Sequence, residues 1–177
     1  MYTSDRISDS ARSIASIKGE NVSKSFLLSY GERDTEGCGV CIVQKSDSEE
    51  TVQIVHKSSI SLRYPLHLAM DKNGRVLLVD HGNARLFLFD QQLENVQDLY
   101  EWRWSFSKVA RGPGRLCLVN LPCVKCTRLL VGLGKGPDNP KNAGAVDIFD
   151  YMSGNECADV RYDKYDLFKQ LNHPGAS

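Results

Sequence analysis

The clearest hydrophobic pattern in the chain lies between residues 64 and 100, where short apolar runs are separated by turn-forming residues. The run Leu66 to Met70 is followed by Asp71-Lys72-Asn73-Gly74, and Asn-Gly is a strong signal for a β-hairpin. This part of the segment therefore predicts a strand and a tight turn that leads into a second strand.

The next two runs, Arg75 to Asp80 and Leu86 to Phe89, flank the turn His81-Gly82-Asn83 and are apolar without alternation. Unalternated runs this short are typical of strands covered on both faces. The segment Leu93 to Tyr100 is more polar and suits an outer edge. Together the four runs predict one antiparallel sheet whose inner strands are buried.

The same segment carries a spaced set of proline, histidine, acidic, glycine and amide residues. Their pattern is Pro65-x-His67-x-Ala69-x-Asp71-x-x-Gly74-Arg75, continued by Val79-Asp80-x-x-Asn83-x-Arg85-x-x-x-Phe89. It resembles an NHL repeat, the blade unit of a β-propeller, and is similar in cadence to the propellers at the C-terminal end of tripartite-motif proteins. The resemblance implies a scaffold with a binding surface rather than a chemistry. It also implies that Asp80, Asn83 and Arg85 form structural hydrogen bonds that hold the turn.

Weaker versions of this pattern occur before and after the central segment. Strands are predicted before it at Ser13 to Ile17, Phe26 to Gly31, Val40 to Val43 and Thr51 to His56, and after it at Gly114 to Val119, Arg128 to Gly132, Ala145 to Phe149 and Ala158 to Phe168. The sequence thus predicts an all-β chain of about three four-stranded antiparallel NHL-like blades, over residues 13–61, 62–104 and 105–170. Residues 1–12 are polar and predicted to be a disordered tail.

Three blades make only a partial ring, because closed propellers have at least about four. We expect either a piece of a longer protein whose missing blades precede Ser13 or a dimer that closes a six-bladed ring through its open edges. The first is favoured, because the first blade lacks an opening proline or histidine. We also expect an uncovered apolar face in the third blade around Phe149 and Tyr151.

Composition adds little to the fold prediction, but it limits the ligands and the cellular compartment that we expect. The 177 residues are 41% apolar and 25% charged, and lysine plus arginine equals aspartate plus glutamate at 22 each, so no overall field attracts nucleic acid or an anionic membrane. No apolar run is long enough to span a membrane, and the N-terminus lacks a secretory signal pattern. We therefore expect a cytoplasmic protein whose six cysteines are reduced.

Two Cys-x-x-Cys pairs, Cys38 with Cys41 and Cys123 with Cys126, have the residue types of a four-thiolate zinc site. In an up-and-down blade their two connections lie on opposite faces, and the pairs are two blades apart. We expect no bound metal and no cofactor. The run Gly132 to Pro137 has the glycines of a phosphate-binding loop, but a proline and a following strand replace the helix that such a loop needs.

Residues 105–150 hold the chain's local excess of positive charge. The cations are Lys108, Arg111, Arg115, Lys125, Arg128, Lys135 and Lys141. Because some NHL propellers bind RNA through a basic face, an RNA-binding propeller is one alternative, although these side chains are predicted to divide between two faces. A lyase or hydrolase with a metal on the propeller axis is a second alternative. The four histidines, His56, His67, His81 and His173, have no paired spacing for such a site, although His67 and His81 belong near the channel.

These patterns favour a non-catalytic interaction module that binds a protein partner, as the substrate-selecting part of a tripartite-motif ubiquitin ligase would. Loops at one rim of a propeller carry binding because the strands are covered. The predicted partner-binding residues are His81, Gly82 and Asn83 in one connection and Lys135 and Lys141 in another. The indoles of Trp102 and Trp104 are predicted to wedge between blades, with their N–H groups near solvent.

Overall fold

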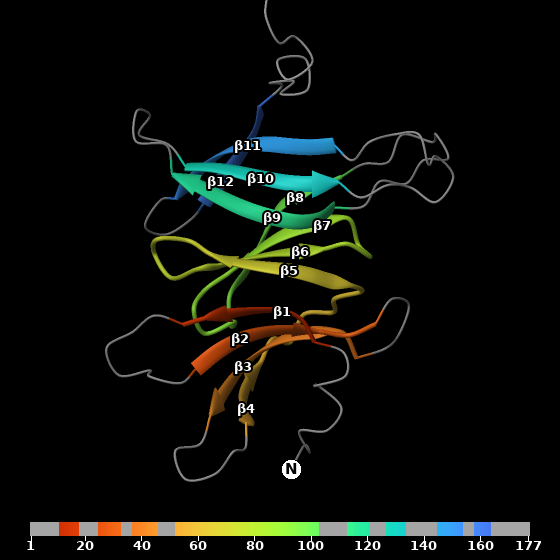
Figure 1. The fold of residues 1–177 in the computed structure, drawn as a ribbon, viewed down its shortest axis with the longest axis vertical. Coiled ribbons are helices and arrows are strands. Elements are labelled where there is room, and N and C mark those ends of the chain that lie inside the picture. Colours follow the sequence, from red (N-terminus) through yellow and green to blue (C-terminus); the bar gives the residue numbers. More distant parts are fainter. Residues whose placement is uncertain are drawn as a thin grey trace, which may run out of the picture.

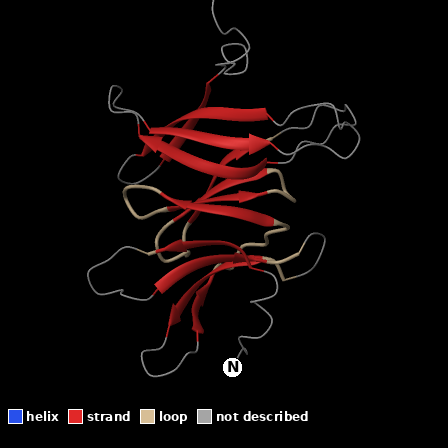
Figure 2. Cartoon of the chain, viewed as in Figure 1, coloured by secondary structure: helices blue, strands red, loops and turns tan. Residues whose placement is uncertain are grey.

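The computed structural model describes residues 11–17, 25–32, 37–45, 52–102, 113–120, 127–133, 145–153 and 158–163. These residues form strands and loops (Figure 2). In this part of the chain there is consequently no helix that is long and apolar enough to cross a membrane. The all-β prediction is confirmed.

Within the described residues, twelve strands form three antiparallel sheets of four strands. The first sheet contains β1 (Ala11–Ser16), β2 (Ser25–Tyr30), β3 (Gly39–Lys45) and β4 (Val52–Lys57). The central sheet contains β5 (Pro65–Met70), β6 (Val76–Asp80), β7 (Arg85–Phe89) and β8 (Val96–Glu101). The third sheet contains β9 (Pro113–Asn120), β10 (Thr127–Leu133), β11 (Ala145–Ser153) and β12 (Ala158–Asp163). In each sheet the strands pair in the order in which they follow along the chain.

The three sheets lie one above another along the longest axis of the molecule, with the first sheet at the bottom of the view and the third at the top (Figure 1). The first strands of the sheets are neighbours, because β5 contacts both β1 and β9. One contact between them is a hydrogen bond of 3.2 Å from the Leu68 backbone N–H to the Ser13 hydroxyl. A side chain of β1 thus satisfies a backbone donor at the open edge of β5.

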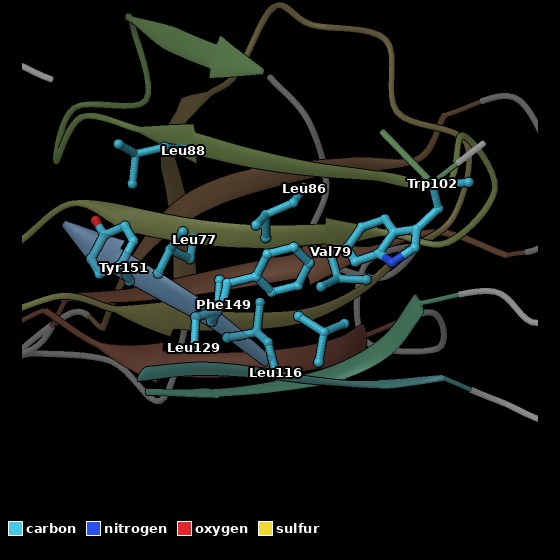
Figure 3. Close-up of a cluster of buried hydrophobic side chains, with 11 residues drawn as sticks. Leu77, Val79, Leu86, Leu88, Trp102, Leu116, Leu129, Phe149 and Tyr151 are labelled. Carbon is cyan, nitrogen blue, oxygen red and sulfur yellow. The ribbon is translucent and has the colours of Figure 1, made fainter. Parts of the chain in front are cut away.

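Both faces of the central sheet are covered, as its unalternated sequence predicts. One face packs on the third sheet through Leu77, Val79, Leu86 and Leu88 (Figure 3). The other face packs on the first sheet through Val76, Leu78, Phe87 and Phe89. None of these eight side chains is more than 7% exposed. Burial of apolar area on both faces is the main force that holds the three sheets together.

Aromatic side chains fill the interface between the central and third sheets. Phe149 is fully buried, with its ring centroid 4.9 Å from that of Tyr100 and 6.1 Å from that of Trp102. Tyr151 is 2% exposed on the same side of β11. The prediction that Phe149 and Tyr151 form an uncovered face is wrong. Alternate residues of a strand face opposite ways, and β11 turns its aromatic residues inward while Val146, 38% exposed, points away.

The turn between β5 and β6 is built on a buried carboxylate. One oxygen of Asp71 accepts hydrogen bonds from the backbone N–H groups of Asn73 (2.8 Å) and Arg75 (2.9 Å). The other accepts from the Arg75 guanidinium (3.0 Å) and the Tyr151 hydroxyl (2.8 Å). Gly74 closes the turn at a φ of 81°, which only glycine adopts without strain. The predicted hairpin is confirmed, and its aspartate also ties the central sheet to the third.

Further details differ from the sequence-based prediction, and β11 extends to Ser153 rather than ending at Phe149. β1 begins at Ala11, inside the predicted tail, whereas residues 1–10 lie outside the described residues. β8 begins at Val96 rather than at Leu93, because Leu93 sits in the preceding turn with a φ of 63° and only 2% of its surface exposed. The Trp102 indole N–H donates to the Asp147 carboxylate at 2.8 Å instead of facing solvent. Trp104 lies outside the described residues.

Candidate binding surface

The connection between β6 and β7 is a tight turn that contains three of the predicted partner-binding residues. The backbone N–H of Ala84 donates to the carbonyl of His81 at 3.2 Å, and Ala84 has a φ of 52°. The N–H of Trp102, just after β8, donates to the Ala84 carbonyl at 2.9 Å. We call the end of the three sheets that carries this turn the β6–β7 rim, and the opposite end, with the Asp71 turn, the β5–β6 rim.

The buried side chain of Asp80 stabilises the β6–β7 rim through hydrogen bonds. Its carboxylate has no exposed surface and accepts hydrogen bonds from the backbone N–H groups of Arg63 (3.1 Å) and Tyr64 (2.8 Å). It also accepts from the Asn83 side-chain amide at 2.7 Å. Asp80 and Asn83 therefore form hydrogen bonds of the kind that the NHL-like motif implies, and they anchor the linker that leads into β5. Arg85 is absent from this network, since it pairs with Asp98 of β8 at 2.8 Å.

Gly82 and His81 are also held by their neighbours. A Cβ atom on Gly82 would lie 2.7 Å from the Arg63 side chain, so a larger residue would push the linker outward. The backbone N–H of His81 donates to the Tyr64 carbonyl at 2.9 Å, and its ring nitrogen Nδ1 lies 2.9 Å from the Pro113 carbonyl oxygen. The predicted residues thus lie together at the rim, and their side chains fix its shape.

Connections of the other two sheets also lie at the β6–β7 rim. The Cys38 thiol, between β2 and β3, donates to the Arg63 carbonyl at 3.2 Å. Pro113, which contacts His81, is paired with Leu133 at the end of β10. The β10–β11 connection therefore leaves from this rim, as predicted. Lys135 and Lys141, the other two predicted binding residues, belong to that connection and lie outside the described residues.

The structure adds residues to this rim that sequence reasoning missed. The Arg12 guanidinium lies 5.5 Å from the centroid of the Tyr64 ring, and its Nε donates to the Gly31 carbonyl at 3.0 Å. The Tyr64 ring meets the His81 ring edge-on at 5.7 Å. Arg63 is exposed beside them. The position of Arg63 and Tyr64 just before Pro65 is the signal that could have found them, because the start of β5 lies at this rim.

The cysteine prediction is only partly covered by the structure. Cys38 and Cys41 are thiols, and burial raises the pKa of Cys41 to about 11, although Lys57 opposes the shift. A thiol that resists deprotonation is a poor metal ligand. Among the residues that the structure describes, no three histidine, cysteine or acidic side chains are grouped as metal ligands. Cys123 and Cys126 lie outside those residues.

The remaining candidates are dispersed. His67 lies in β5, where burial and the nearby positive charge of Arg115 lower its pKa. His56 lies in β4, and His173 is outside the described residues. In the basic segment, Arg128 forms an ion pair with Asp150, which removes it from a patch that could bind phosphate. Its five lysine and arginine residues other than Arg115 and Arg128 are outside the described residues, as is the glycine-rich run after Leu133.

No protein-family model matches this chain, and no curated protein is significantly similar to it in sequence.

Proposed function

We propose that the three sheets are successive blades of an NHL-like β-propeller arc and that the chain is a non-catalytic module that binds a protein partner through its β6–β7 rim. The arrangement of β1, β5 and β9 as neighbours supports the first part, because first strands adjoin one another around a propeller axis. The motif-like hydrogen bonds of Asp80 and Asn83 support it as well.

The observation that carries the binding proposal is the convergence of connections on one rim. Asp80 and the His81 turn hold this rim together through hydrogen bonds, while Arg12, Arg63 and Asn83 are exposed on it. Loops on a rigid, covered scaffold can vary in sequence without disturbing the core, which makes them suitable for recognition. In a tripartite-motif-like protein, such a rim would select a substrate for chemistry carried out elsewhere.

Affinity capture from cell lysate, with and without nuclease, tests this function. We compare the wild-type chain with Lys135→Glu/Lys141→Glu on the β10–β11 connection. The matched control is Lys45→Glu/Lys72→Glu, which makes the same charge change at exposed positions on the opposite rim. We expect a nuclease-resistant protein partner that the first variant loses and the control retains. A partner that both variants retain would show that this face is the wrong one, and a partner released by nuclease would indicate RNA.

A further inference from the structure

Two side chains on the β6–β7 rim have donor groups with no acceptor within the part of the chain that the structure describes. They are the terminal nitrogens of Arg12, whose Nε alone is used by the Gly31 carbonyl, and the hydroxyl of Tyr64. Both are held in place, since Arg12 lies over the Tyr64 ring and the His81 ring packs against that ring at nearly a right angle. The His81 ring is itself held, because its Nδ1 lies 2.9 Å from the Pro113 carbonyl oxygen.

Among the residues that the structure describes, the side chains around these donors carry more positive than negative charge. Arg63 is exposed on the same linker, next to Tyr64. The nearest buried acid, Asp80, is shielded because it has no exposed surface and its oxygens accept hydrogen bonds from two backbone N–H groups and Asn83. In the described part of this rim, Glu32 is the exposed acid at the end of β2, and Arg12 and Arg63 are the exposed arginines. Fixed donors beside positive charge are the requirement for binding an anion.

We propose that Arg12 and Tyr64, with the His81 ring packed against the tyrosine, form a binding site for the carboxylate of an acidic protein segment; this inference rests on the proposed function and specifies the chemistry of the partner. A guanidinium can donate two parallel hydrogen bonds to a carboxylate, and the tyrosine hydroxyl supplies another donor beside it.

A carboxylate fits this site better than RNA does. Recognition of single-stranded RNA depends on aromatic faces on which bases stack, but Arg12 already covers a face of the Tyr64 ring and His81 lies against it. The donors also form one compact cluster, whereas a phosphate backbone needs a track of cations.

Fluorescence polarisation with defined peptides tests the proposal. The probe is a fluorescein-labelled peptide of five Gly-Glu repeats, and its uncharged match contains five Gly-Gln repeats. We expect the wild-type chain to prefer the glutamate peptide. Arg12→Gln should weaken binding about tenfold and Tyr64→Phe about fivefold, because each loses a hydrogen bond to a charged group. Lys72→Gln, which removes one exposed charge on the β5–β6 rim, should leave the affinity unchanged within about twofold.

Three results would overturn the site. One is equal affinity for the two peptides, and another is equal behaviour of Arg12→Gln and Lys72→Gln. The third is tighter, Arg12-dependent binding of a ten-nucleotide oligouridine, which would make phosphate the ligand. Tyr64→Phe keeps the ring and its contacts, so it tests the hydroxyl even where Arg12→Gln disturbs β1. In a further outcome, the Arg12→Gln variant captures the same partner from lysate as the wild-type chain, while the Lys135→Glu/Lys141→Glu variant loses that partner. This result would support the proposed function and contradict the carboxylate site.

Discussion

The central and first sheets have the same four-stranded layout but differ in how completely they are covered. Every residue of β6 is buried, because the first sheet covers one face of the central sheet and the third sheet covers the other. In β2 the buried positions alternate with half-buried ones. The buried set is Ser25, Leu27 and Ser29, and the half-buried set is Phe26, Leu28 and Tyr30.

This difference shows that coverage and side-chain size are separate properties of a strand. The face of β2 toward the central sheet carries two serines and one leucine, yet it is the better buried. The larger side chains lie on the far face, near Ile14, which is 64% exposed. An alternating pattern therefore tells which positions share a face, but the neighbouring sheet decides which face is covered.

The largest expected effect separates a buried position of β11 from an exposed one. Phe149→Ala should lower the free energy of unfolding by about 3–5 kcal/mol, because it removes a fully buried ring between two sheets. Val146→Ala on the opposite side of β11 should cost less than about 1 kcal/mol. Urea denaturation followed by tryptophan fluorescence measures both. Similar costs would contradict the packing of β11 on the central sheet.

A smaller effect is expected where the linker from the first sheet joins the central one. Asp80→Ala should destabilise the chain by roughly 2–4 kcal/mol, since it leaves the N–H groups of Arg63 and Tyr64 without their acceptor. Asp90→Ala, in the more exposed turn after β7, should cost about 1 kcal/mol. The same denaturation experiment compares them. An equal loss for the two variants would mean that Asp80 does not join the sheets.

The poorer fit of the first sheet should also allow an improvement. The Ser29 hydroxyl is fully buried and has no hydrogen-bond partner among the residues that the structure describes. Ser29→Ala should therefore leave stability unchanged or raise it by about 1 kcal/mol, because it removes the cost of burying that hydroxyl. Ser13→Ala is the matched control and should be destabilising, since the Ser13 hydroxyl accepts from Leu68. A destabilised Ser29→Ala variant would reveal a partner for this hydroxyl.

The smallest effect is a pH dependence at the inner edge of the central sheet. Burial and the charge of Arg115 lower the pKa of His67 below its usual 6.5, so the unfolded chain binds the proton more readily than the folded chain. Stability should therefore fall as the pH decreases through and below about 6.5. Urea midpoints at pH 7.5 and 5.5 should differ less in His67→Gln than in the wild-type chain. An unchanged difference would assign the pH dependence to other groups.

The sequence predicted the sheets well because their signals are local. Unalternated runs located β6 and β7, and Asp71 to Gly74 predicted its turn correctly. A short apolar run does not tell which face of β11 packs on the central sheet. Phe149 was therefore predicted to be uncovered, whereas it is fully buried.

The rim was predicted only in part. His81 to Asn83 follow a strand in the sequence, and their position could be read from it. The contact between Arg12 and Tyr64 joins residues of different sheets. It depends on how the sheets stack, and no local pattern encodes that arrangement.

The order of strands within each sheet has a consequence for how the chain acquires its structure. Every ladder joins strands that are adjacent in sequence, so each needs only a short loop to close and forms without waiting for a distant segment. During synthesis the first sheet can complete its ladders before the central one emerges, and then offers it a surface on which to condense. Growth by units of about 50 residues also means that duplication or loss of a whole unit in evolution leaves every ladder intact.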